Sequence, residues 1–214
     1  MILSPVRIYS AAWRVALVLL TAEIAAVSAL RYLTGSEPGP PPVLANRFAH
    51  PFLLIHVIGG MTALLAGPAQ FVRQLRARWP AVHRLTGRLY VAGCALAAPA
   101  GFMLALGTTA GPVAALGFAI PALLLPWFTW LGLRAAVEQR FNDHREWMLR
   151  SYGVISTAIT LRLMLPAAGL LGLEFLPAYR LISWAAWITN LALVEMAIHR
   201  RREAVAAAPN VAPA

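Results

Sequence analysis

The sequence predicts an all-α membrane protein in which six transmembrane helices form one bundle. Three observations support this fold class: 60% of the 214 residues are apolar and 12% are charged, the apolar residues are grouped into six long stretches, and arginines lie between these stretches. A soluble fold of this length could not cover so apolar a chain with so few charges. We therefore expect no separate soluble domain.

The six apolar stretches are long enough to cross a bilayer, because a hydrocarbon core of ~30 Å needs about 20 residues at ~1.5 Å each. The first stretch resembles a signal peptide, but it approaches full spanning length and contains Glu23, which favours an uncleaved span. Residues 1–203 then form a single membrane domain, followed by a disordered tail at 204–214. The predicted spans are residues 11–33, 51–71, 85–106, 111–133, 148–171 and 181–198.

The eighteen arginines predict the orientation of the bundle, since arginine near the ends of spans is retained in the cytoplasm. Three arginines fall on one side of the predicted spans, namely Arg31, Arg47 and Arg180, and Arg162 lies inside a span. Fourteen fall on the other side: Arg7, Arg14, Arg73, Arg76, Arg78, Arg84, Arg88, Arg134, Arg140, Arg145, Arg150, Arg200, Arg201 and Arg202. This bias predicts that both termini are cytoplasmic and that the protein is a multi-pass protein of the bacterial inner membrane.

The net charge of +10 indicates a membrane partner and no nucleic acid. The arginines flank apolar spans, where they face anionic headgroups of the lipid bilayer. A homo-oligomer or a complex with a membrane partner subunit is compatible with such a bundle. The single cysteine, Cys94, lies within the third span and is expected to be a small packing residue.

Small residues at a spacing of four predict that the second and third spans pack closely. Each of these spans presents a row of small side chains on one face, which lets two helix backbones approach. The rows are Gly59, Ala63 and Gly67 on the second span and Gly93, Ala97 and Gly101 on the third.

An intramembrane polar cluster is predicted from four residues that reach similar depths on four different spans: Glu23, His56, Arg162 and Asn190. Polar groups in the bilayer are costly, roughly 2.5 to 3.5 kcal/mol for a central arginine on the insertion scale, so each needs a partner. One interpretation is an ion pair between Arg162 and Glu23, with His56 and Asn190 as hydrogen-bonding partners. The alternative is a ligand or proton site.

The arginine-rich side carries two similar segments, because a His-Arg pair stands at the start of both the third and the fifth span. These pairs are His83-Arg84 and His144-Arg145. Asp143 and Glu146 lie three residues apart near the second pair, which favours helix capping by these carboxylates before any catalytic role. No catalytic residue is identified.

The order of these motifs resembles the domain of unknown function 2306 family of predicted prokaryotic membrane proteins. The resemblance covers roughly residues 50–195, and the family carries no established activity. It supports the membrane fold and implies that His56, His83, His144 and Arg162 matter together. The motifs are His56 with Gly59-Gly60, Gly67-Pro68-Ala69-Gln70-Phe71, His83-Arg84 with Gly87-Arg88-Leu89-Tyr90, His144-Arg145 with Trp147-Met148 and Arg150-Ser151-Tyr152, and Leu161-Arg162-Leu163.

One functional hypothesis is a redox module that binds haem b or a divalent metal, since histidines on neighbouring helices can ligate iron from opposite faces. The candidate cofactor ligands are His56, His83 and His144. His83 and His144 lie at one level near the cytoplasm, with His199 close by, and these three are the candidate metal ligands. His56 has no histidine at its own depth, so a second haem there would need Met103 or Met164 as its other axial ligand.

The alternative is a protein without enzymatic activity: a permeation or binding protein for protons, small solutes or lipids, or a membrane assembly scaffold. Six alternating spans suit all of these functions. No hydrolase motif or phosphate-binding glycine loop is present. The sequence leaves open whether the protein is an enzyme.

Overall fold

A computed structural model describes residues 45–207, and within this range the chain forms seven helices and no strand. Residues before 45 and after 207 lie outside the described structure, including the first predicted span and most of the predicted tail. The helices are α3 (Ala49–Gln70), α4 (Arg73–Arg78), α5 (Pro80–Gly107), α6 (Pro112–Val137), α7 (Phe141–Ile155), α8 (Thr157–Leu170) and α9 (Phe175–Ala206).

Five helical segments in the described range are long and apolar enough to cross a membrane: α3, α5, α6, α7 with α8, and α9. Each coincides with one of the last five predicted spans. The all-helical prediction is thus confirmed for these residues. The predicted boundaries are too short at several ends, because helical hydrogen bonding continues beyond the apolar residues: α9 starts at Phe175 and ends at Ala206, beyond the predicted end of the domain at residue 203.

Proline and glycine mark the starts of two long helices. Pro80 and Pro112 occupy the first turns of α5 and α6, where a missing N–H is harmless and the fixed φ suits a helix. Gly111, directly before α6, has φ of 94°, a left-handed conformation that glycine adopts readily. The chain therefore turns tightly between the two helices.

The predicted seam of small residues joins α3 to α5. A Cβ atom on Gly59 would lie 2.7 Å from the Ala97 nitrogen and from the Gly93 oxygen, and one on Gly93 would lie 2.7 Å from the Ala63 nitrogen. Ala63 and Ala97 are almost fully buried. The two backbones touch, which confirms that these spans pack closely through their small residues.

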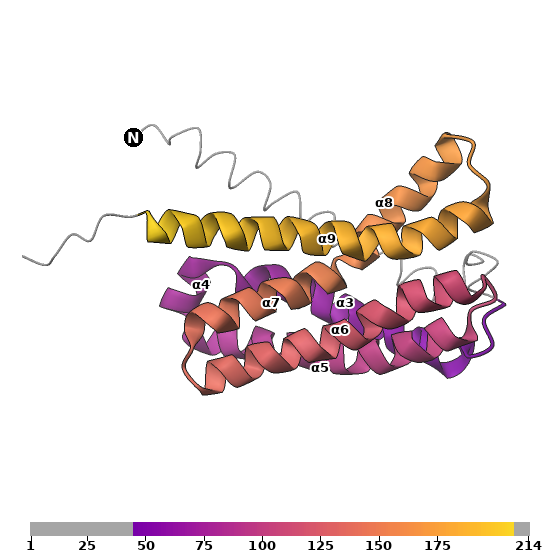
Figure 1. Ribbon diagram of the computed structural model, residues 1–214. Helices are drawn as coiled ribbons and strands as arrows, with labels where there is room; N and C mark the ends of the chain where they lie inside the picture. Colours follow the sequence, from indigo (N-terminus) through magenta and orange to yellow (C-terminus); the bar gives the residue numbers. More distant parts are fainter. Residues whose placement is uncertain (1–44, 208–214) are drawn as a thin grey trace, which may run out of the picture.

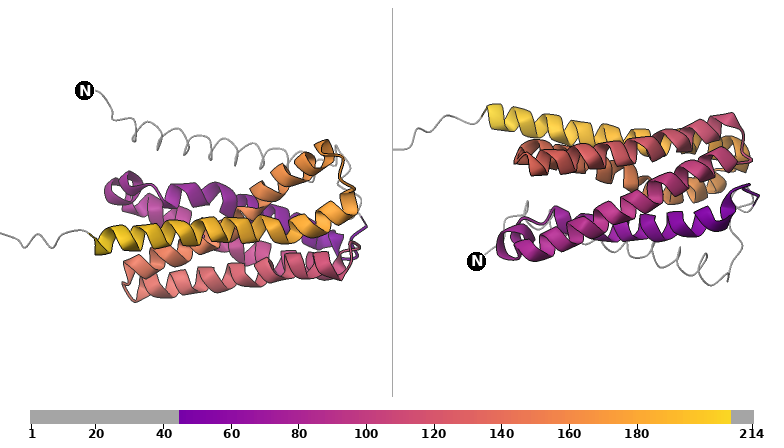
Figure 2. Two further views of the ribbon diagram at one scale, coloured as in Figure 1. Left: turned by 45° about the horizontal axis from the view of Figure 1, so that its top comes forward. Right: turned by 90° about the horizontal axis from the view of Figure 1, so that it is seen from below.

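The long helices lie roughly alongside one another, and α3 and α5 lie together on one side of α6, α7 and α9 (Figure 2). Figure 1 shows α4 at one end of the bundle, together with the starts of α5 and α7 and the last turns of α9. We call this end the arginine-rich end. At the opposite end, α8 leans away from α6 and forms a hairpin with α9.

The fifth predicted span is not one continuous helix. α7 ends at Ile155 and α8 begins at Thr157, with Ser156 between them. The Ile159 N–H bonds the Ser156 carbonyl at 2.9 Å, a one-residue tightening of the helical pattern at this point. The fifth predicted span, residues 148–171, is one candidate crossing, as predicted, but its helix is interrupted at Ser156. The interruption was not predicted, because neither glycine nor proline stands at this position.

Candidate functional site at the arginine-rich end

Polar and aromatic contacts hold the end of α3 against α5 and α7. The Gln70 amide donates to the Thr86 hydroxyl at 2.5 Å, which ties the last residue of α3 to the second turn of α5. A Cβ atom on Gly67 would overlap the Tyr152 ring, so glycine is what lets the α7 tyrosine lie against α3. The Phe71 ring meets the Tyr152 ring edge to face at 5.5 Å. These motif residues serve packing.

A buried chain of hydroxyl groups ties α5, α6 and α7 together. The Ser151 oxygen lies 2.7 Å from the Tyr90 hydroxyl and 2.7 Å from the Thr129 hydroxyl, and Thr129 donates to the Leu125 carbonyl at 2.7 Å. The Thr129 hydroxyl donates its only proton to the Leu125 carbonyl, so it must accept from Ser151. Ser151 then has no proton left for Tyr90, and Tyr90 donates to Ser151. The chain thus has one direction, and Ser151, at its centre, packs α7 against α5 and α6.

Carboxylates neutralise one part of the arginine-rich end, around the loop between α6 and α7. Arg134 donates to Glu138 at 2.8 Å, and Arg140 bonds both Glu138 and Asp143. These hydrogen bonds, from Arg134 first and then Arg140, hold the pKa of the exposed Glu138 carboxyl below its ordinary value. Glu138 therefore remains ionised and paired at pH values where an isolated glutamate would take up a proton.

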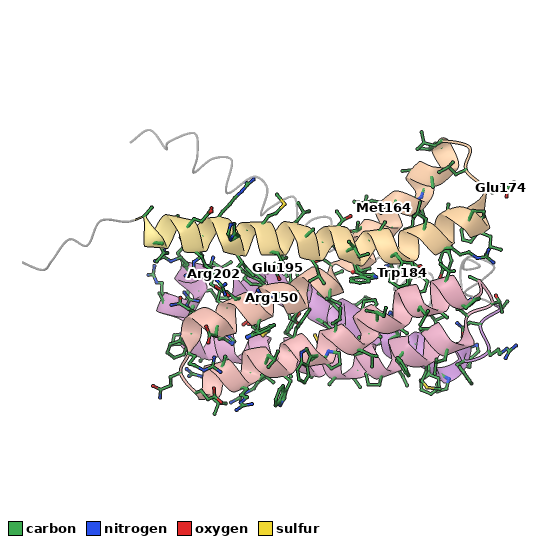
Figure 3. The ribbon with its side chains drawn as sticks, viewed as in Figure 1. Arg150, Met164, Glu174, Trp184, Glu195 and Arg202 are labelled. Carbon is green, nitrogen blue, oxygen red and sulfur yellow. The ribbon has the colours of Figure 1, made fainter. Side chains whose placement is uncertain are left out.

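A second group of carboxylates joins α7 to α9 (Figure 3). Arg150 donates from Nε and Nη2 to the two oxygens of Glu195 at 2.6 and 2.8 Å, and its guanidinium lies 4.6 Å from the centre of the Trp147 ring. Arg202 donates to both oxygens of Glu146. The bidentate geometry makes these strong, specific pairs.

The carboxylates Asp143 and Glu146 do not cap α7. This helix begins after Arg140 without any side-chain cap, and both carboxylates bind arginines instead. The capping interpretation is therefore wrong: Asp143 binds Arg140 through one oxygen, and Glu146 binds Arg202 through both.

The remaining arginines at this end have no carboxylate within ion-pair distance among residues 45–207. They are Arg73, Arg76 and Arg78 of α4, Arg84 and Arg88 of α5, Arg145 of α7, and Arg200 and Arg201 of α9. Charge compensation is thus uneven. Carboxylates pair Arg134, Arg140, Arg150 and Arg202, whereas the eight arginines just named have none among the described residues.

Arg145 interacts electrostatically with arginines of two other helices. These are Arg201 of α9 and Arg76 and Arg73 of α4, and among residues 45–207 Glu146 is the carboxylate that opposes them. That carboxylate already binds Arg202 through both oxygens. We call Arg73, Arg76, Arg145 and Arg201 the cation cluster.

Two of the predicted histidines lie beside the cation cluster. His83 interacts electrostatically with Arg76, His144 and Arg84, and its Nδ1 atom is buried without a hydrogen-bond partner in the described structure. His144 Nδ1 donates to the Gly132 carbonyl of α6 at 2.8 Å. Because a carbonyl only accepts, this bond places the ring proton on Nδ1 and leaves Nε2 with a free lone pair whenever the ring is neutral.

The third candidate metal ligand, His199, is exposed and pairs with Glu203 one turn later on α9 at 3.2 Å. Over residues 45–207, no group of three or more histidine, cysteine or acidic side chains is arranged to hold a metal ion. His83 and His144 interact electrostatically, but the structure does not bring His199 together with them as a third metal ligand.

The predicted intramembrane cluster is brought together in part. His56 Nδ1 donates to the Ala97 carbonyl of α5 at 2.8 Å, and His56 interacts electrostatically with Arg162. Arg162 donates to the Ala158 carbonyl at 3.0 Å. Asn190 accepts a hydrogen bond from Thr160 at 2.8 Å. The predicted partner Glu23 lies outside the described residues.

Some functional residues were not predicted from the sequence. Thr129 joins the buried hydroxyl chain, and nothing in its local pattern distinguishes it from a lipid-facing threonine. Arg150 was assigned only to a side of the membrane, although its spacing of four from Glu146 is a pattern typical of helical ion pairs.

The fold and this site define an all-helical integral membrane protein with a partly neutralised, strongly basic end. The chain belongs to the family described as predicted membrane protein (DUF2306), whose model matches residues 53–198, and this confirms the resemblance seen in the sequence. No curated protein and no solved structure matches the chain.

Proposed function

We propose that this protein binds the anionic headgroup of a phospholipid at the cation cluster. The observation that carries the proposal is the electrostatic environment of Arg145. Arginines of α4 and α9 act against its charge, and Glu146, the carboxylate that favours it among residues 45–207, is engaged by Arg202. Like charges held together repel one another unless an anion lies between them. A phosphate group offers the oxygen acceptors that guanidinium groups bind in bidentate fashion.

The surroundings of the cluster favour a lipid as the source of the phosphate. Trp79, between α4 and α5, is 58% exposed, and Leu85 on the first turns of α5 is 57% exposed. Tryptophan is enriched where apolar and aqueous regions of a membrane meet. Arginines beside such side chains lie at headgroup depth, where each contributes about 1 kcal/mol to the attraction of anionic lipid.

This proposal includes an orientation. The arginine-rich end faces the cytoplasm of a bacterial inner membrane, and the chain crosses that membrane six times, with both termini on the cytoplasmic side. The arginine bias between the two sides supports this topology. An Arg145→Cys variant checks it, because Cys94 is buried: an impermeant maleimide should label the new thiol in inside-out vesicles and not in right-side-out vesicles.

We expect Arg145→Gln to weaken the binding of phosphatidylglycerol roughly fivefold, the equivalent of about 1 kcal/mol for one lost arginine contact. Binding can be measured by native mass spectrometry of detergent-purified protein titrated with phosphatidylglycerol or phosphatidylcholine. Phosphatidylcholine, whose headgroup has no net charge, should bind the unmodified protein more weakly than phosphatidylglycerol does.

Arg134→Gln is the matched control, since it removes the same charge from the same end but from an exposed pair with Glu138. It should leave phosphatidylglycerol binding within about twofold of the unmodified protein. Equal losses in the two variants, or equal binding of the two lipids, would contradict a specific site at the cation cluster.

A second candidate function, haem b binding, is favoured by the orientation of two histidines. His56 and His144 each donate Nδ1–H to a backbone carbonyl, at 2.8 Å in both cases, which leaves Nε2 as the basic atom. Histidines that ligate metals commonly donate their other ring N–H to a carbonyl in this way. A haem at the arginine-rich end would take His83 and the Nε2 atom of His144 as its two axial ligands, and the iron would supply one-electron redox chemistry. His56 bonds Ala97, fourteen positions after His83 on α5 and thus about 21 Å along that helix, so it would serve a separate haem.

The haem hypothesis predicts a Soret band in the absorbance spectrum of protein purified from cells supplied with haem, shifting on reduction with dithionite. His144→Ala and His83→Ala should each reduce or displace this band. His199→Ala should not, because that ring is exposed and pairs with Glu203. A colourless preparation, or a band that survives in both His144→Ala and His83→Ala, would contradict this candidate.

A further inference from the structure

The cation cluster joins arginines from two sides of the bundle to Arg145 of α7. Arg201 belongs to α9, which packs beside α7, whereas Arg73 and Arg76 belong to α4, which packs against α3 and α5 on the other side of the bundle (Figure 2). Arg145 interacts electrostatically with the arginines of both helices. An anion can therefore lie on either side of Arg145, toward α9 or toward α4.

Hydrogen bonds hold the α9 side of the cluster in place. Asn142 and Arg145 are three positions apart and thus lie on one face of α7. Arg201 donates to the Asn142 side-chain oxygen at 3.3 Å, and its neighbour Arg202 binds Glu146. The bond to Asn142 uses one of the N–H donors of the Arg201 guanidinium, and the described residues supply no carboxylate for the others. An anion between Arg145 and Arg201 would accept from these donors.

The α4 side of the cluster offers a second pair of guanidinium groups. Arg73 and Arg76 are three positions apart, so they lie on one face of this short helix. The hydrogen bond from Gln70 to Thr86 ties the end of α3 to α5 directly before α4, which fixes where the helix begins. The two arginines of α4 therefore form a second position for an anion, separate from the position beside α9.

Accessibility and charge both favour a ligand with more than one phosphate. All four arginines of the cluster are exposed or partly exposed, so a headgroup at the membrane surface can reach them. A single phosphodiester brings one negative charge to these four positive charges, and it cannot lie on both sides of Arg145 at once. Two linked phosphates neutralise twice the charge and occupy both sides.

We propose that the cation cluster binds a lipid that carries two phosphate groups, one between Arg145 and Arg201 and the other between Arg145 and the arginines of α4. The inference rests on the proposed binding of phospholipid headgroups at this cluster and names the class of lipid. Cardiolipin, in which a glycerol joins two phosphates, has this chemistry and is bound by basic sites between membrane helices. Once the first phosphate is bound, the linker holds the second at a high effective concentration beside its own arginines.

The proposal is tested by native mass spectrometry of the detergent-purified protein titrated with cardiolipin and, separately, with phosphatidylglycerol. We expect cardiolipin to bind about 10- to 100-fold more tightly, as a linked second contact implies. In Arg201→Gln this advantage should fall to roughly threefold, because one phosphate loses its α9 partner. Arg200→Gln is the matched control, since it removes the same charge from the adjacent, exposed position of α9 outside the cluster. The advantage of cardiolipin should persist in that variant.

Phosphatidic acid separates the number of phosphates from the number of charges, because its single phosphate carries about two negative charges at neutral pH. Binding as tight as that of cardiolipin would overturn the proposal. A cardiolipin advantage that survives in Arg201→Gln would also overturn it, since the advantage would then arise from the additional acyl chains. Displacement of cardiolipin by an equimolar amount of inorganic pyrophosphate would overturn the assignment to a lipid.

Failure of this inference differs from failure of the proposed function. Equal binding of cardiolipin and phosphatidylglycerol, with both weakened in Arg145→Gln, would overturn the two-phosphate assignment and leave phosphatidylglycerol binding at the cluster intact. Absence of saturable binding for both lipids would contradict the proposed function as well.

Discussion

Gly59→Ala is expected to be strongly destabilising. The new methyl group would lie 2.7 Å from backbone atoms of Gly93 and Ala97, and backbone cannot move aside as a flexible side chain can. Overpacking typically costs about 1 to 3 kcal/mol, and we expect the upper end of that range, because α3 and α5 must separate along their whole seam. The midpoint of thermal unfolding in detergent and the yield of monodisperse protein measure the effect.

Gly60→Ala is the adjacent control. A Cβ atom on Gly60 meets nothing within 4 Å, so the substitution adds helix propensity without a clash. It should leave the unfolding midpoint unchanged or raise it slightly, since glycine in a helix costs roughly 0.5 to 1 kcal/mol relative to alanine. Similar midpoints for the two variants would show that α3 and α5 do not pack through this seam.

Ser151→Ala is expected to have the second largest effect, because Ser151 is the middle member of the buried hydroxyl chain. Without its oxygen, Tyr90 loses its hydroxyl acceptor and Thr129 loses a donor, and the buried Tyr90 hydroxyl keeps only the Cys94 thiol, a weak acceptor. The loss of good partners by buried polar groups costs about 1 to 3 kcal/mol. The thermal midpoint of the purified variant should fall accordingly.

Tyr90→Phe should cost less, about 1 kcal/mol, since it removes a donor and leaves Ser151 still bonded to Thr129. In the Tyr90→Phe/Ser151→Ala double variant, no tyrosine hydroxyl remains to be stranded. The double variant should therefore lose less stability than the sum of the losses in the two single variants. Additive losses would show that Tyr90 and Ser151 act independently, against the chain that the structure describes.

The helical spans were predictable because their signal is carried by many residues at once. Twenty consecutive apolar positions determine a crossing whatever their order, so the last five predicted spans coincide with the helices of the structure. Helix ends depend on single hydrogen bonds beyond the apolar residues, which is why α9 extends past both predicted ends. At the interruption, Asn190 binds the Gly153 carbonyl and the Thr160 hydroxyl, which are distant from it in sequence, so local sequence cannot reveal these contacts.

The candidate site was predictable where spacing within one helix determines the contact. The four-residue rows of small residues predicted the seam between α3 and α5, and the arginine bias predicted the arginine-rich end. The sequence could not predict which arginines pair with carboxylates, because the pairs join different helices. Glu195 of α9 binds Arg150 of α7, and Glu146 of α7 binds Arg202 of α9. Nor could hydropathy show that His83 lies beside His144 while His199 pairs locally with Glu203.

The direction of the buried hydroxyl chain limits what it can conduct. Its last proton rests on the carbonyl of Leu125, a backbone oxygen that does not take up and release protons in the way a titrating side chain does. The series from Tyr90 to Thr129 consequently joins three helices, and in its own direction it delivers no proton beyond Leu125.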